Sequence, residues 1–113
     1  MKTIDWYYFR KGWTSCKRAQ EFLEPKNVEV TTTIYANKER FDHDAAWLML
    51  KDATKIFTAK GKKIEEWDPK SDSKEDILKK AMGPSGNLRA PTIQIQGHFY
   101  VGFNPEMYED MLS

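Results

Sequence analysis

The only cysteine of the chain, Cys16, lies in residues 12–16 (GWTSC), between a strand-like segment and a helix-like segment. Backbone N–H groups at the start of a helix stabilise negative charge, so this position favours the thiolate form of a cysteine. Lys17 and Arg18 add two cations beside it. Trp13 stands three residues before Cys16, where a Cys-x-x-Cys motif carries its attacking sulfur. The segment predicts a redox-type site that lacks half of its motif.

Two interpretations of Cys16 stay open. Cys16 shares a helical face with Ala19 and Leu23, which is typical of a small buried apolar residue. Alternatively it is a resolving thiol that attacks a mixed disulfide or selenylsulfide formed at position 13. The basic residues around the turn either lower the thiol pKa and bind the carboxylates of glutathione, or form a solvated charged rim. These residues are Arg10, Lys11, Lys17 and Arg18.

The composition predicts a single domain over residues 1–113, because 13.2 kDa and 40% hydrophobic residues suffice for one core. The strand and helix patterns described below make this domain α/β. A net charge of +1 and a pI of about 7.8 predict no direct binding to nucleic acid or membrane. His43 and His98 are far apart and lack ligand spacing, so no metal site is expected. One unpaired cysteine and the lack of a long apolar run favour a cytoplasmic location.

The chain begins with the pattern of a β-α-β unit. Residues 3–9 are aromatic and β-branched, which is typical of a buried strand. Apolar residues then recur at helical spacing from residue 15 until Pro25 ends the pattern. Residues 28–35 alternate between apolar and polar side chains and predict a second strand. A right-handed crossover and a parallel strand pair follow from this order.

The middle of the chain predicts a helical insertion over about residues 42–82. Apolar residues from Ala46 to Phe57 recur at helical spacing, after a segment, Asp42-His43-Asp44, that can cap a helix. Residues 60–63 predict a turn, residues 65–73 are mostly polar, and residues 73–82 predict another helix.

The last third predicts an antiparallel hairpin and a terminal helix. Residues 91–103 alternate with period two around a tight turn near Gly97. Asn104 followed by Pro105 predicts the start of a short helix.

The element order, with a redox-type turn after the first strand and a proline opening the third, resembles a thioredoxin fold. More narrowly, it resembles the arsenate-reductase-like family, which includes the Spx regulators. The resemblance rests on residues 13–19 (WTSCKRA), 22–24 (FLE), 88–93 (LRAPTI) and 101–104 (VGFN). It implies a four-stranded mixed sheet with a helical insertion, and a cis peptide bond before Pro91.

The resemblance also assigns roles within the site. In Spx-like proteins the turn contains Cys-Thr-Ser-Cys, so Cys16 matches the second cysteine and Trp13 occupies the place of the first. Arsenate reductases of this family keep their nucleophile at that same place. They also bind the oxyanion with arginines at positions that hold Ala90 and Gly102 here, whereas Arg89 lies one residue earlier. Arsenate reduction is therefore not expected of this chain.

We expect Cys16 and position 13 to be the catalytic positions. In proteins of this fold, the backbone beside the cis proline faces the redox turn and pairs with the substrate backbone. The resemblance therefore implies that residues of the turn and residues next to Pro91 bind substrate. This binding set is Arg10, Lys11, Gly12, Thr14, Ser15, Arg89, Ala90 and Pro91.

Trp13 itself suggests a hypothesis about the natural residue at this position. The selenocysteine codon, UGA, differs by one base from the tryptophan codon, UGG. A recoded gene would then give tryptophan where the working protein has a selenol paired with Cys16. The alternative is a natural tryptophan, and the native codon decides between them.

Two classes of function follow. The first is a thiol- or selenol-disulfide oxidoreductase without a bound cofactor, which uses glutathione or thioredoxin as reductant and a small thiol or protein disulfide as substrate. With Trp13 in place, this chain is expected to be weakly active or inactive. The alternative is a regulatory or protein-binding module without catalysis, since Spx-like proteins bind RNA polymerase and use their cysteines as a redox switch.

Overall fold

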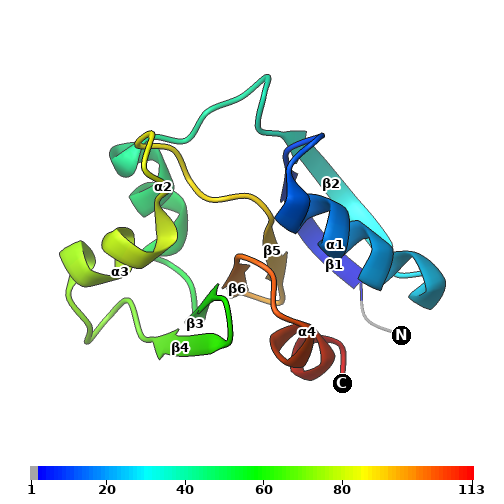
Figure 1. The fold of residues 1–113 in the computed structure, drawn as a ribbon. Helices are drawn as coiled ribbons and strands as arrows, with labels where there is room; N and C mark the ends of the chain where they lie inside the picture. Colours follow the sequence, from blue (N-terminus) through cyan, green and yellow to red (C-terminus); the bar gives the residue numbers. More distant parts are fainter. Residues whose placement is uncertain (1–2) are drawn as a thin grey trace.

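Strand β1 pairs with strands from both halves of the chain. In the computed structural model, which describes residues 3–113, one mixed sheet combines with four α-helices (Figure 1). The elements are β1 (Thr3–Phe9), α1 (Thr14–Leu23), the 3-10 turn η1 (Glu24–Lys26), β2 (Glu29–Tyr35), α2 (His43–Leu50), β3 (Lys55–Lys60), β4 (Lys63–Trp67), α3 (Lys74–Ala81), β5 (Thr92–Ile95), β6 (His98–Val101) and α4 (Pro105–Leu112).

The sheet has six strands in the order β2-β1-β5-β6-β3-β4, so the prediction of a four-stranded sheet is wrong. β1 and β2 are parallel, as predicted for the β-α-β unit, and β5 and β6 form the predicted antiparallel hairpin. β3 lies parallel to β6, and β4 lies antiparallel to β3. The two additional strands extend the sheet on the side away from β2.

The predicted helical insertion is wrong in its middle, because β3 and β4 lie between α2 and α3. Helix α2 ends at Leu50, and Phe57 belongs to β3 instead of continuing the helix. There its ring stacks on Tyr100 of β6, with ring centroids 5.0 Å apart. Trp67 of β4 donates a hydrogen bond from Nε1 to Thr58 Oγ1 at 3.0 Å. Contacts with distant strands therefore override the local helical spacing.

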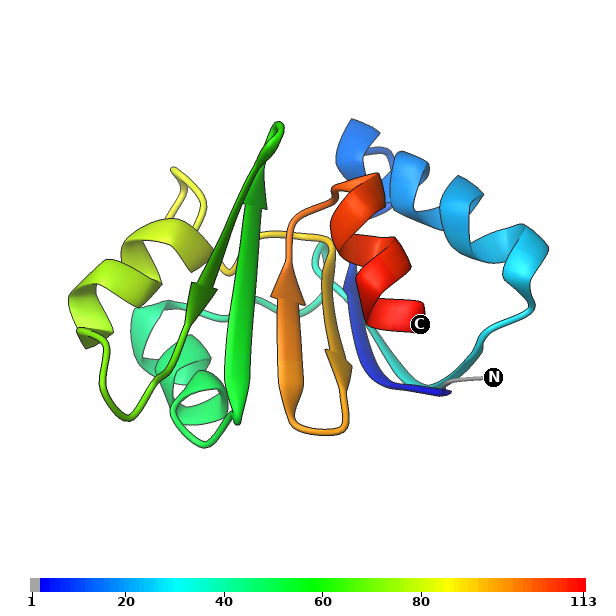
Figure 2. The ribbon, with the colours of Figure 1, turned by 90° about the horizontal axis from the view of Figure 1, so that it is seen from below.

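Two apolar clusters pack around the sheet. Tyr8 belongs to the cluster that includes buried residues of α2 and α3, whereas the adjacent Tyr7 belongs to the cluster that includes α1 and α4. Neighbouring residues of a strand point to opposite faces, which explains this division. Helices α2 and α3 lie together, away from α1 and α4 (Figure 2). None of the helices in residues 3–113 is both long and apolar enough to cross a membrane.

The local signals for helix starts and for the hairpin turn are confirmed. Asn104 accepts a hydrogen bond from the backbone N–H of Met107 at 3.1 Å, and Asp42 accepts one from Ala45 at 2.9 Å. In the hairpin turn, Gln96 and Gly97 have φ of 50° and 81°. Both residues are left-handed, as the tight two-residue turns of hairpins require.

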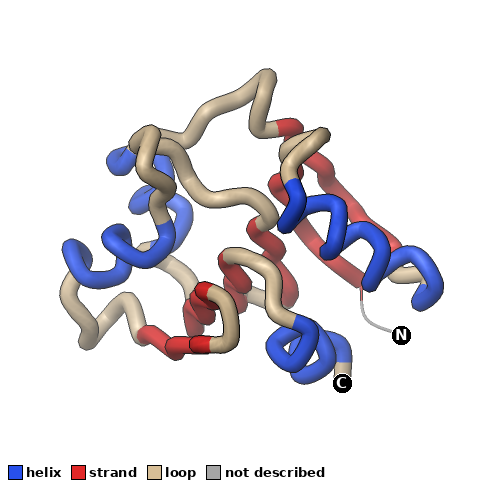
Figure 3. Tube along the Cα trace, in the orientation of Figure 1, coloured by secondary structure: helices blue, strands red, loops and turns tan. Residues whose placement is uncertain are grey.

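Two long loops, which connect β2 to α2 and α3 to β5, run beside each other (Figure 3). Asn87 of the second loop accepts a hydrogen bond from the backbone N–H of Phe41 at 2.7 Å. Its Nδ2 donates to the hydroxyl of Tyr8 at 3.1 Å, and that hydroxyl donates to the carbonyl of Glu39 at 2.6 Å. Asn87 thereby fixes both loops to the end of β1.

We expect Asn87→Ala to lower the free energy of unfolding by about 2 kcal/mol, because buried polar groups lose their partners. Urea denaturation followed by circular dichroism measures this change. Asn37→Ala is the matched control, since Asn37 is exposed. Equal stability of the two variants would contradict the structural role of Asn87.

Candidate functional site

The turn between β1 and α1 places residue 13 at the helix start. Gly12 has φ of +93°, a conformation that favours glycine, and it turns the chain into the helix. Trp13 occupies the N-cap position with extended backbone, and its side chain forms no capping hydrogen bond. The indole is 42% exposed, and the guanidinium carbon of Arg10 lies 4.4 Å from the centre of its ring. An exposed aromatic ring, with a cation stacked on it, therefore occupies the expected nucleophile position.

Cys16 is fully buried on the inner face of α1. Its Sγ accepts a hydrogen bond from the backbone N–H of Arg10 at 3.3 Å. Burial raises the pKa of the Cys16 thiol, and it outweighs the lowering effects of the Arg10 hydrogen bond and charge. Burial thus opposes the thiolate form that the helix start and the cations were predicted to favour. Arg18, expected beside the thiol, instead lies over the ring of Phe103 at 5.3 Å.

The raised pKa of Cys16 has a consequence for stability in alkali. The folded protein holds this proton to a higher pH than the unfolded chain does. Its contribution to stability is complete below the pKa of the unfolded thiol, and it is lost as pH rises through the higher pKa of the folded state. We expect Cys16→Ala to lose less stability than the parent chain between pH 8 and 10. Urea unfolding at several pH values measures the free energy of unfolding of both proteins. An identical dependence of that free energy on pH in the two proteins would contradict the prediction.

A cleft of about 570 Å³ opens beside the turn. It is bordered by the start of α1, the ends of β3 and α3, a residue of β4 and the loop that precedes β5. Several residues predicted for the site line this cleft, although the turn and the loop are more than 70 residues apart. They are Arg10, Trp13, Ser15, Arg89 and Ala90.

The other predicted residues do not line the cleft. Gly12 and Thr14 are exposed beside it, whereas Lys11 lines a second hollow between α1 and β2. Pro91 is buried, and the Ala90–Pro91 peptide bond is cis, as the resemblance predicted. Cys16 lies behind the turn, shielded from the cleft by its burial. The cleft therefore presents position 13, and not Cys16, to a ligand.

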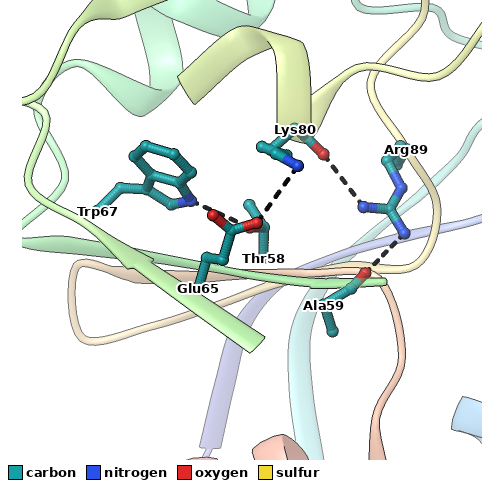
Figure 4. A network of polar contacts seen from close by, with 6 residues as sticks. All are labelled: Thr58, Ala59, Glu65, Trp67, Lys80 and Arg89. Carbon is teal, nitrogen blue, oxygen red and sulfur yellow. Dashed lines mark hydrogen bonds and ion pairs between the residues drawn. The ribbon is translucent and has the colours of Figure 1, made fainter. Parts of the chain in front are cut away.

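Arg89 is fixed in the cleft wall by backbone carbonyls (Figure 4). Its Nη1 donates to the carbonyl of Lys80 at 3.1 Å and its Nη2 to the carbonyl of Ala59 at 2.8 Å. Gly102 makes this arrangement possible, because a Cβ there would lie 2.6 Å from the carbonyl oxygen of Ala59. Burial lowers the pKa of Arg89, but an arginine side chain stays charged in proteins.

The cleft also contains charged residues that the sequence did not reveal: Lys60, Glu65, Lys79 and Lys80. Glu65 pairs with Lys80 at 3.4 Å (Figure 4). The sequence alone allows two interpretations of Lys60, a group of lysines that binds an anion or a partner and a solvated charged face, and lysines in a helix carry no motif. The position of β3 next to β6, with β4 beside β3, and the packing of α3 bring these side chains to the same cleft as the turn after β1.

Comparisons with known proteins assign no family. No protein-family model matches this chain, and no curated protein gives a significant match. Within residues 3–113, no cluster of three His, Cys, Asp or Glu side chains is arranged to hold a metal ion. The site is therefore interpreted from its geometry: an exposed N-cap side chain in a basic cleft, with a buried thiol one helical turn behind it.

Proposed function

We propose that the protein is a thiol- or selenol-disulfide oxidoreductase of thioredoxin-like fold, similar to the arsenate-reductase-like family. Its nucleophile position, 13, carries tryptophan in this chain. The observation that supports this function best is the pairing of an exposed position 13 in the cleft with a buried Cys16 three residues later. An attacking chalcogen must meet substrate, whereas a resolving thiol reacts only after the mixed disulfide forms.

The arrangement of the strands supports a thioredoxin-like fold. The parallel pair β1 and β2 continues into the antiparallel hairpin of β5 and β6, as the resemblance implies for the central four strands. Strands β3 and β4 then belong to the insertion between β2 and β5. Ala90, next to the cis proline, lines the same cleft as Trp13, which supports the proposal that the backbone beside the proline pairs with a substrate held at position 13.

The proposed reaction begins when the chalcogen at position 13 attacks one sulfur of a substrate disulfide. A mixed disulfide or selenylsulfide forms, and the other substrate sulfur leaves as a thiolate and takes up a proton. Cys16 then loses its proton, attacks the chalcogen and releases the second substrate thiol. Two electrons have passed to the substrate, and position 13 is bonded to Cys16. Two glutathione molecules reduce this bond and become glutathione disulfide.

Arsenate is not the proposed substrate. At the place of the last-strand arginine, Gly102 has φ of +90°, and even a Cβ would meet Ala59 and Arg89. At the place of the other arginine is Ala90, and Arg89 donates to backbone carbonyls. Disulfide reduction by glutathione also fits the cytoplasm, which is the proposed location because thiols stay reduced there.

A trapping experiment tests the proposed nucleophile position. The Trp13→Cys/Cys16→Ser double variant carries an attacking thiol but no resolving thiol, so glutathione disulfide is expected to leave one glutathione on position 13. Peptide mapping by mass spectrometry locates the adduct. The parent chain is the control, because its buried Cys16 is expected to stay unmodified while the protein is folded. Absence of an adduct from the folded double variant would overturn the proposed function.

The native codon at position 13 tests the selenol form of the proposal. A UGA codon that is decoded as selenocysteine would support it, since the tryptophan in this chain would then replace a selenol. A UGG codon would contradict the selenol form. Trp13→Cys would then test only whether an ancestor of this chain, with a cysteine at position 13, reduced disulfides.

A second candidate function is a regulatory or protein-binding module without catalysis. It is favoured by the exposed Trp13, which together with Arg10 offers an aromatic and cationic surface at the cleft. Such a module is expected to bind its partner equally well after Cys16→Ser, but to lose it after Trp13→Ala. Affinity measurements with a purified partner distinguish this function from catalysis, because the covalent mixed disulfide of the catalytic route requires a thiol or selenol at position 13.

A further inference from the structure

We propose that the cleft binds small-molecule disulfides that carry negatively charged groups. This inference rests on the proposed function and names its substrate class. It follows from the charges that line the cleft, from its volume and from the position of Trp13 at one of its walls.

The charges in the cleft are strongly one-sided, although the whole chain has a formal net charge of only +1. The cationic lining residues are Arg10, Lys60, Lys79, Lys80 and Arg89, and the one acidic lining residue is Glu65. Within residues 3–113, the ion pairs are Lys55 with Glu66 and Lys80 with Glu65. The other cations of the cleft therefore have no carboxylate partner. Charges of one sign in a concave site raise the local concentration of an oppositely charged ligand.

Arg89 gives this charge a fixed position. Two of its N–H groups donate to the carbonyls of Ala59 and Lys80, and carbonyl oxygens leave the positive charge without an anionic partner. The guanidinium is part of the wall of the cleft and contributes a positive charge there. Lys60 and Lys79 are exposed side chains near it, so they can adjust to the ligand.

The size and the apolar part of the lining indicate a small molecule. A volume of about 570 Å³ lies within the range of small-molecule sites, about 300–1,000 Å³. Met82, Pro84 and Leu88 also line the cleft and add apolar surface to it. A ligand with a short apolar spacer between a disulfide and a carboxylate would place the disulfide near position 13 and its charge near the lysines.

The experiment compares three small disulfides with the Trp13→Cys variant at low ionic strength. The probes are dithiodipropionate, which is anionic, hydroxyethyl disulfide, which is neutral, and cystamine, which is cationic. Each rate is divided by the rate with free cysteine as reductant, which removes differences in intrinsic reactivity. We expect the normalised kcat/KM to be about ten-fold higher for the anionic than for the neutral disulfide, and lowest for the cationic one.

Charge variants assign this preference to the cleft. In the Trp13→Cys background, Lys60→Gln with Lys79→Gln is expected to raise KM for dithiodipropionate by about five-fold and to leave KM for hydroxyethyl disulfide unchanged. Lys51→Gln is the matched control, because Lys51 is exposed at the end of α2, outside the cleft. An equal effect of the control variant would overturn the inference.

The outcomes separate the inference from the function on which it rests. Equal normalised rates for the three disulfides would overturn the inference and leave the oxidoreductase function standing. Failure to reduce any disulfide would overturn that function. Calorimetry with the parent chain then tests the cleft independently of turnover. Binding of dithiodipropionate that weakens about ten-fold between low salt and 0.5 M salt would support the anion site, and binding insensitive to salt would contradict it.

Discussion

Trp13→Cys is expected to increase glutathione-dependent reduction of hydroxyethyl disulfide at least about 100-fold over the parent chain. An indole cannot attack a disulfide, and Cys16 is fully buried with a raised pKa, so the parent chain has no accessible nucleophile. A thiol at position 13 would lie at a helix N-terminus, beside the Arg10 guanidinium that now covers the Trp13 ring. Both features stabilise a thiolate. A coupled assay that follows NADPH oxidation by glutathione reductase measures the rate.

Two control variants separate nucleophilic attack from changes in cleft shape. Trp13→Ser opens the cleft in a similar way but supplies no thiol, so its rate is expected to equal that of the parent chain. In the Trp13→Cys background, Cys16→Ser is expected to accumulate the mixed disulfide and to depend on external glutathione for its release. A Trp13→Ser variant as active as Trp13→Cys would show that position 13 does not attack the substrate.

Gly102→Ala is expected to lower the free energy of unfolding by about 3 kcal/mol. Its φ of +90° is unfavourable for alanine, and the new Cβ would lie 2.6 Å from the carbonyl oxygen of Ala59 and 2.9 Å from Nη2 of Arg89. Relief of this clash requires that residue 102 move away from Ala59 and Arg89, which disturbs the hydrogen bond that joins those two residues. Urea denaturation followed by circular dichroism measures the change.

Gly61→Ala is the matched control for the backbone effect. Gly61 also has a positive φ, +60°, but a Cβ there would have no atom within 4 Å. We expect this variant to lose only about 1 kcal/mol, because it pays only for the backbone conformation. Equal destabilisation by the two substitutions would show that close packing around Gly102 contributes nothing.

The parts of the fold that the sequence predicts correctly are those with local causes. Asn104 and Pro105 start a helix through one side chain and one fixed φ, and the turn at Gly97 needs only two left-handed residues. Phe57 was assigned to a helix because its spacing from Ala46 fits a helical period. Its place in β3 depends on Tyr100, which is 43 residues away, and no local pattern contains that contact.

The candidate site was predictable to the same extent. The segment around Trp13 and the segment around Ala90 each carry a short motif, and the structure places both at the cleft. Lys60 and Lys79 carry none, so only the order of strands in the sheet reveals that they face the same cleft. The burial of Cys16 was left open, since a helical face shared with apolar residues fits both a resolving thiol and a structural one.

The hydrogen bonds of Arg89 bear on how this architecture can diversify. One guanidinium joins the loop before the cis proline to β3 and to the end of α3, and both of those elements belong to the segment between β2 and β5. That segment also supplies Lys60 and Lys79 to the cleft. Substitutions within it can therefore alter one wall of the cleft while the turn that contains Trp13 and Cys16 stays the same. Two separate stretches of the chain thus build the cleft, and the wall that the segment forms can change without a change in the turn.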